Sequence, residues 1–147
     1  MMENHLAEIK VSYSTNNSEK QKITSSQVAF QLLLGSWNIN TIELLEECKI
    51  LLLNRTNEVL GIYHLSKGGV SGTVVDAKIV FAVALKCNAS GIILCHNHPS
   101  SNLSPSNVDK AITSKIKKAG KLLDIVLIDH LIITTVGYYS FSENGLI

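Results

Sequence analysis

Three stretches of the chain repeat apolar residues at the three- and four-residue spacing of an amphipathic helix. The first follows a Thr-Ser-Ser cap at 24–26 and is expected to end near Gly35, because glycine commonly stops a helix. The second begins after Asp76, whose carboxylate can accept hydrogen bonds from free backbone N–H groups. The third is expected to open at the Ser-Pro pair 104–105, with proline in its first position, and to stop at Gly120. The pattern therefore predicts three helices.

Short apolar runs bounded by turn residues predict the strands of a sheet. The predicted strands are 50–53, 59–65, 91–95, 125–128 and 131–136, with a further segment around 138–141. The first two flank a polar turn at 54–57 and are expected to form a hairpin, and the third leads directly into His96. Because strands and helices alternate through the middle of the chain, we expect an α/β fold. It would have three layers, α/β/α, in which helices flank a mixed β-sheet on both faces.

The composition is that of a single domain with its own core. Residues 1–22 are polar and lack a sustained period, so we expect a loose N-terminal arm followed by one domain at 23–147. Of the 147 residues, 46% are hydrophobic and 17% are charged, so a core can form without disulfides. Cys48, Cys87 and Cys95 form no CxxC pair and are expected to be reduced core residues.

Charge and hydropathy bear on the cellular setting. The net charge of +1 gives no overall attraction to nucleic acid. The longest apolar runs are too short to cross a bilayer, and residues 1–11 lack the apolar stretch of a signal peptide. We therefore expect a soluble, cytoplasmic protein with no membrane partner.

The segment 96–109 holds the residues that can carry chemistry. His96 and His98 stand two apart at the end of a predicted strand, so a period of two places both imidazoles on one face. Asp109 arrives from the first turn of the next helix, with Ser106 three residues before it on about the same side. Two neutral imidazoles and a carboxylate suit zinc, and three protein ligands leave a fourth position for water. The sequence therefore predicts one zinc ion per chain, although the same ligands would accept other divalent ions.

This spacing is that of a known motif. His96-x-His98, seven further residues and then Ser106-x-x-Asp109 resembles the signature of JAMM (MPN-plus) metalloproteases. The stretch His-Asn-His-Pro-Ser at 96–100 and the later pair at 129–130 resemble the RadC branch of that family. The resemblance covers roughly residues 45–147. It implies a JAB fold, similar to that of the cytidine deaminases, for the domain at 23–147.

The resemblance also implies a reaction, in which zinc-activated water hydrolyses the amide bond of a peptide or isopeptide substrate of unknown identity. A glutamate ahead of the strand at 50–53 would act as general base. Glu46 takes this role if Cys48 is aligned with an aromatic residue of the family. Glu47 is the alternative, because a shift of one residue reverses the face on which it lies. Ser106 would donate a hydrogen bond to the oxyanion, and it can also cap the helix.

The chain departs from the family in two respects. Ser101 stands where RadC proteins often have glycine. Longer RadC proteins carry a helix-hairpin-helix-like region ahead of the catalytic domain, and the residues before 45 are too few to supply it. The family's association with DNA repair therefore finds little support in these residues.

Two other metal-dependent enzyme classes fit the sequence less well. HNH nucleases disperse their motif along a hairpin and a helix, and zinc deaminases need HxE and PCxxC, which the sequence lacks. A nucleic-acid-binding module remains an alternative, because the third predicted helix carries Lys110, Lys115, Lys117, Lys118 and Lys121. A domain that binds metal without hydrolysing anything is another. We expect a structural role for His130. The oligomeric state stays open, because exposed strand edges and the N-terminal arm would permit a homodimer without requiring one.

Overall fold

The computed structural model describes residues 3, 5–15, 19–69 and 72–147. Its helices are α1 (Ser26–Leu34), α2 (Ala77–Lys86) and α3 (Asn107–Leu122). Its strands are β1 (Glu47–Leu53), β2 (Val59–Lys67), β3 (Gly91–Asn97), β4 (Val126–Ile133) and β5 (Tyr138–Ser140). The strands form one sheet in the order β2-β1-β3-β4-β5, in which only β3 and β4 pair in parallel. The predicted α/β fold with a mixed sheet is confirmed.

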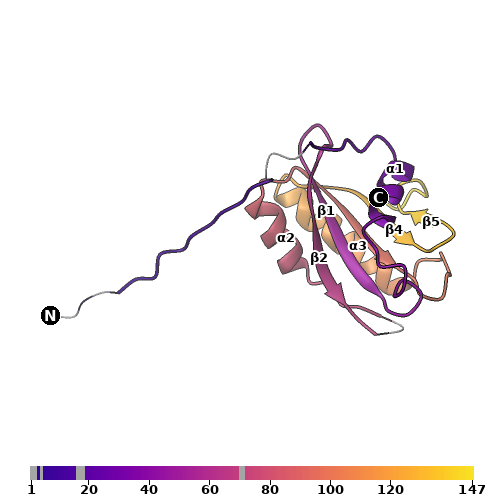
Figure 1. Ribbon diagram of the computed structural model, residues 1–147. Coiled ribbons are helices and arrows are strands. Elements are labelled where there is room, and N and C mark those ends of the chain that lie inside the picture. Colours follow the sequence, from indigo (N-terminus) through magenta and orange to yellow (C-terminus); the bar gives the residue numbers. More distant parts are fainter. Residues whose placement is uncertain (1–2, 4, 16–18, 70–71) are drawn as a thin grey trace.

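The helices cover both faces of this sheet (Figure 1). α2 and α3 pack on one face, against a core that includes Ile50 and Leu94. α1 packs on the other face, against a core that includes Leu51 and Ile93. Because alternate residues of a strand face opposite sides, His96 continues the row that faces α2 and α3. The sheet therefore presents His96 toward the first turns of α3.

The three cysteines are free and buried, as the sequence predicts. Cys48 and Cys87 belong to the core under α2 and α3, and Cys95 belongs to the core under α1. Burial raises the pKa of each of these thiols, so the thiols stay protonated and act as core residues.

The start of α3 differs from its prediction. Pro105 lies ahead of the helix, and Ser106 is the N-cap. The hydroxyl oxygen of Ser106 accepts from the backbone N–H of Asp109, and the Asp109 carboxylate accepts from the backbone N–H of Ser106. This reciprocal capping box satisfies two free N–H groups, so it fixes the start of the helix more strongly than proline does.

The end of α3 also differs, because Gly120 lies inside the helix rather than beyond it. A Cβ atom at Gly120 would lie 2.2 Å from the carbonyl oxygen of Ile125. The glycine therefore permits the chain leaving α3 to return close to the helix, and the helix continues to Leu122.

The two strands predicted at 125–128 and 131–136 are one continuous strand, β4, so that prediction is wrong. The polar pair 129–130 suggested a break. Both side chains are buried within the strand, and each is satisfied by hydrogen bonds. An irregularity in the pairing leaves Ile128 unpaired, since Ile92 pairs with Leu127 and Ile93 pairs with Asp129.

Residues 5–15 lie outside the sheet. Residues 5–15 form no helix or strand and extend away from the rest of the chain (Figure 1). Lys22 forms an isolated β-bridge with Glu58, outside the strands of the sheet. The boundary of the arm at residue 22 stays a prediction. Within the described residues, no helix combines the length and the hydropathy that a membrane span requires.

Candidate metal centre

The candidate site lies where β3 ends and β1 begins. His96 is the penultimate residue of β3, and His98 follows the strand by one residue. Glu46 immediately precedes β1, whose Cys48 pairs with His96 in the antiparallel ladder. Asp109 comes from the first turn of α3. The fold therefore brings together four residues, of which Glu46 and Asp109 are 63 positions apart in the sequence.

The ligand atoms of these residues converge closely. The Nε2 atoms of His96 and His98 are 3.0 Å apart. The Asp109 carboxylate lies 3.2 Å from His96 Nε2 through Oδ1 and 3.4 Å from His98 Nε2 through Oδ2. Glu46 Oε1 lies 3.8 Å from His96 Nε2.

These separations fit a tetrahedral metal ion. Zinc binds imidazole nitrogen and carboxylate oxygen at about 2.0–2.2 Å, which at a tetrahedral angle puts neighbouring ligand atoms about 3.3 Å apart. The 3.0 Å between the two Nε2 atoms is close to that value, and so are the 3.2 and 3.4 Å from them to the two different oxygens of Asp109. Glu46, His96 and His98 also form a group whose ligand atoms all lie within 4.8 Å of one another. Two carboxylates therefore flank the imidazole pair, with Asp109 nearer than Glu46.

The electrostatics of the cluster distinguish the two carboxylates. Burial alone would raise the pKa of the Asp109 carboxyl, but the adjacent imidazoles of His96 and His98 outweigh burial and hold that pKa well below its usual range. Burial raises the pKa of Glu46, although the nearby imidazoles oppose this shift. Asp109 is thus a firmly ionised acceptor, whereas Glu46 is the more basic of the two and the better proton acceptor.

A backbone carbonyl on the side away from the cluster orients the imidazole of His98. Its Nδ1 lies 2.5 Å from the carbonyl oxygen of Asn102, which can only accept, so Nδ1 carries a proton and Nε2 turns to the cluster. The hydrogen bond to Asp109 is the main cause that raises the pKa of His98. A histidine that binds metal through one nitrogen commonly donates from the other in this way.

The backbone of the loop after His98 has a conformation at Ser101 that favours glycine. Its φ angle is +66°, in the left-handed region that glycine adopts without steric cost. The backbone N–H of Ser101 also donates to the carbonyl oxygen of His98, closing a tight turn. The turn requires a conformation for which serine is a poor residue.

Glu47, the alternative general base, faces away from the cluster. Its carboxylate lies 3.4 Å from Lys67 Nζ and 4.0 Å from Lys49 Nζ. Glu46 is therefore the glutamate that the fold brings to the two histidines. Ser106 adjoins Asp109, because its hydroxyl accepts from the backbone N–H of Asp109, and it lines the same cleft as His98.

Two cavities open beside the cluster. A cleft of about 840 Å³ has Glu46, His98, Ser106 and Asp109 in its wall. A pocket of about 260 Å³ is bordered by His96, His130 and Asp109 and by the apolar residues Val74, Val75, Val108 and Ile112. The cluster is thus open to a molecule as large as a peptide segment.

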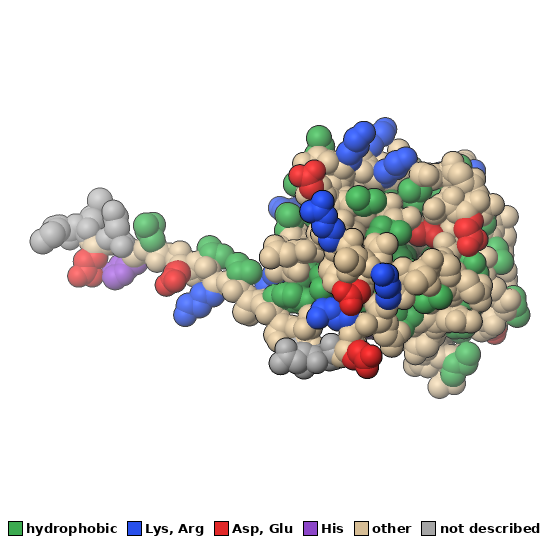
Figure 2. Space-filling model, turned by 90° about the horizontal axis from the view of Figure 1, so that it is seen from above, with side chains coloured by type: hydrophobic (Ala, Val, Ile, Leu, Met, Phe, Trp, Pro, Cys, Tyr) green, Lys and Arg blue, Asp and Glu red, His purple; other side chains and the backbone are tan. Residues whose placement is uncertain are grey.

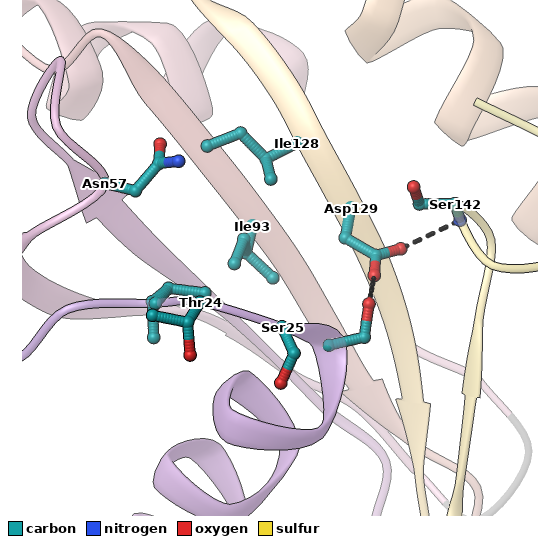
Figure 3. A pocket seen from close by; sticks show the side chains of 9 residues that line it. Thr24, Ser25, Asn57, Ile93, Ile128, Asp129 and Ser142 are labelled. Carbon is teal, nitrogen blue, oxygen red and sulfur yellow. Dashed lines mark hydrogen bonds between the residues drawn. The ribbon is translucent and has the colours of Figure 1, made fainter.

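A third cavity, of about 190 Å³, lies on the opposite face of the sheet and borders Asp129 (Figure 3). The Asp129 carboxylate accepts hydrogen bonds from the Ser26 and Ser140 hydroxyls and from the backbone N–H groups of His130 and Ser142. Because four donors occupy this carboxylate, Asp129 fastens α1 and the segment after β5 to the sheet. It takes no part in the histidine cluster.

His130 lies closer to the candidate site than its sequence pattern indicated. Its Nε2 lies 2.8 Å from Nδ1 of His96, so it is in direct contact with the cluster. The pair 129–130 resembled the RadC branch, which was a signal that this histidine lies near the site. Its position inside an apolar strand favoured a structural role instead.

Comparison with known proteins agrees with the sequence motif. The profile of the RadC-like JAB domain matches residues 23–146. A UPF0758 protein of Flavobacterium johnsoniae is 49% identical over 129 residues, covering 86% of this chain and 54% of that protein. A UPF0758 protein of Clostridium beijerinckii is 41% identical, covering 86% of this chain and 54% of that protein. A UPF0758 protein of Thermotoga maritima is 39% identical, covering 68% of this chain and 45% of that protein. The chain therefore spans about half the length of the curated relatives that it matches.

Proposed function

The chain belongs to the family of RadC-like JAB domains, and we propose that it is a zinc-dependent hydrolase of the JAMM type that cleaves a peptide or isopeptide bond. In this proposal His96, His98 and Asp109 hold the metal, Glu46 is the general base and Ser106 assists at the oxyanion. The observation that carries the proposal is the convergence of the two Nε2 atoms and the Asp109 carboxylate at separations of 3.0–3.4 Å.

The proposed reaction consumes one water and breaks one amide C–N bond. Zinc supplies a bound water whose pKa can fall to about 7. Glu46 accepts a proton from the attacking water and delivers it to the leaving nitrogen, so that an amine and a carboxylate are the products. The Ser106 hydroxyl donates a hydrogen bond to the carbonyl oxygen as negative charge develops on it.

Two features support the role of Glu46. Its carboxylate lies 3.8 Å from His96 Nε2, farther than the 3.2 Å of the Asp109 carboxylate, which suits a proton acceptor rather than a metal ligand. Its raised pKa suits a group that must take a proton and then return it. Asp109, whose pKa is held low, suits a ligand that stays ionised.

The test is cleavage of a defined peptide mixture, together with a model isopeptide linked through a lysine Nε, by the zinc-loaded protein. Mass spectrometry would identify new ends. We expect Glu46→Gln to lower the rate by at least about 100-fold, the usual contribution of a general base, with zinc binding retained. Glu47→Gln is the matched control and should cleave at nearly the wild-type rate. Equal rates for wild type and Glu46→Gln would contradict the proposed base.

The same assay addresses the alternative of a metal-binding domain without hydrolytic activity. That alternative predicts a zinc-loaded wild type that yields no new ends from either substrate. Cleavage that stops when a chelator is added and resumes when zinc is restored would contradict this alternative.

Nucleic-acid binding is a second alternative, and one observation favours it. The lysines of α3 are all exposed: Lys110, Lys115, Lys117, Lys118 and Lys121. On the face in Figure 2, however, Lys and Arg side chains are interspersed with acidic and hydrophobic ones. We therefore expect no shift of duplex or branched DNA in a gel at low salt, and a salt-sensitive shift would support the alternative.

A homodimer also stays a prediction. β2 is an edge strand of the sheet and exposes Ile62 and Tyr63. Exposed edge strands can pair with a second copy.

A further inference from the structure

A row of three buried side chains runs from His96 back to α3. His96 Nδ1 lies 2.8 Å from His130 Nε2, and His130 Nδ1 lies 2.6 Å from the Thr113 hydroxyl oxygen. The Thr113 hydroxyl in turn donates to the backbone carbonyl oxygen of Asp109 at 2.7 Å. The row therefore begins at one proposed zinc ligand and ends at the backbone of another.

The direction of these hydrogen bonds follows from the last one. A hydroxyl has one proton, and Thr113 gives that proton to a carbonyl that can only accept. Its oxygen must then accept from His130 Nδ1–H. A neutral His130 protonated at Nδ1 can only accept at Nε2, so His96 must donate from its own Nδ1. The remaining nitrogen of His96, Nε2, is left with its lone pair toward His98 and Asp109.

We propose that Thr113 and His130 are positioning residues that hold His96 as the tautomer protonated at Nδ1, with Nε2 free to bind the metal. This inference rests on the proposed function for the identity of the bound metal, but the direction of the hydrogen bonds does not depend on it. In the opposite direction His130 would donate from Nε2, and His96 would carry its proton on the nitrogen that faces the site.

The surroundings of His130 suit this role. The residue is 1% exposed and Thr113 is 2% exposed, so water does not compete for their hydrogen bonds. Phe141 stacks on the His130 ring at a centroid distance of 4.6 Å and an angle of 9°, which fixes the plane of the ring. Its two ring nitrogens bond to a hydroxyl and to an imidazole rather than to a carboxylate, as suits a neutral ring.

The position of Thr113 adds a constraint on Asp109. Thr113 lies four residues after Asp109, one turn along α3, and its hydroxyl bonds to the Asp109 carbonyl. The same row of hydrogen bonds therefore orients the His96 ring and ties it to the helical turn that carries Asp109. A metal site benefits from such support because ligand orientation is then fixed before the ion arrives.

The direct test is long-range ¹H–¹⁵N NMR of the histidine rings in the metal-free protein, at about pH 8, above the ordinary histidine pKa of about 6.5. The two ring nitrogens differ in chemical shift according to which carries the proton. We expect His130 protonated at Nδ1 in the wild type and in Thr113→Ser, which keeps the hydroxyl. Thr113→Val removes the acceptor, so His130 should shift toward protonation at Nε2. Wild-type His130 already protonated at Nε2 would overturn the inference, whatever the variants do.

Zinc affinity is the second readout, measured by competition with a chromogenic chelator. Thr113→Val should bind zinc about 10- to 100-fold more weakly, the usual effect of losing a group that orients a metal ligand. Thr113→Ser should stay close to the wild type. Ser140→Ala is the control, because it removes a buried hydroxyl from the opposite face of the same sheet.

The outcomes separate this inference from the proposed function. Equal affinities for Thr113→Val, Ser140→Ala and the wild type would overturn the positioning role while leaving the zinc site intact. A wild type that binds no zinc would overturn the proposed function, and the NMR result would still decide the direction of the hydrogen bonds.

Discussion

Asn97 accepts a 2.7 Å hydrogen bond from the backbone N–H of Glu47 through its side-chain oxygen. Its side-chain nitrogen donates to the backbone carbonyls of Ile42 and Leu45, at 2.7 and 2.8 Å. The residue between the two histidines thus fastens the segment that carries Glu46 to the end of β3. The candidate base and the candidate ligands owe their proximity in part to this fully buried amide.

Replacing this amide by a carboxylate should be costly. In Asn97→Asp, an oxygen would face the two carbonyl oxygens that now accept hydrogen bonds, inside a buried site. We expect the free energy of unfolding to fall by about 3 kcal/mol or more, measured by urea denaturation. Asn102→Asp, at an exposed position that uses only its oxygen, should change it by less than about 0.5 kcal/mol. Similar losses in both variants would contradict the proposed fastening role.

Ser101 offers the opposite prediction. Because its φ angle is +66°, Ser101→Gly relieves a steric cost of about 1–2 kcal/mol and adds an entropic cost of about 0.5–1 kcal/mol. The variant should therefore be more stable to urea by up to about 1.5 kcal/mol. Ser100→Gly, one residue earlier and without a positive φ angle, should be less stable than the wild type. A destabilised Ser101→Gly protein would show that the turn is not strained by serine.

Two substitutions at Ser106 separate its structural and proposed chemical roles. Ser106→Ala loses the cap and should cost about 1 kcal/mol of stability, whereas Ser106→Gly should cost only a few tenths. Both lack the hydroxyl, so both should lower the rate of peptide cleavage by about 100- to 1000-fold if it assists the oxyanion. A glycine variant with wild-type activity would leave Ser106 with the capping role alone.

Asp129 and His130 are adjacent in sequence but should behave differently. Asp129 faces α1 and is held by four donors, so Asp129→Asn should lower thermal stability. It should leave zinc affinity within about threefold of the wild type, because its side chain does not reach the histidine cluster; the chelator competition checks this. A tenfold loss of affinity would mean that the two faces of the sheet are coupled.

The sequence predicted most of the elements because their signals are local. The caps at Ser25 and Asp76, the hairpin and the strand that leads into His96 all follow from short patterns, and the structure confirms them. The motif at 96–109 likewise predicted that its residues would gather, and they do.

The errors arose where long-range contacts decide the structure. The polar pair in β4 is compatible with a strand only because α1 and the segment after β5 donate to Asp129 and because His96 and Thr113 contact His130. No local pattern contains those partners. Gly120 looked like a helix end because no sequence pattern shows that the carbonyl of Ile125, five residues after the glycine, packs against it.

The most direct test of the account is the zinc content of the purified protein after removal of metal and reloading at neutral pH, compared with His98→Ala and Asp109→Ala. We predict about one zinc per chain in the wild type and in Ser140→Ala, and a loss of bound zinc in the two site variants. A wild type that takes up no zinc, or site variants that retain it in full, would contradict a metal centre at His96, His98 and Asp109.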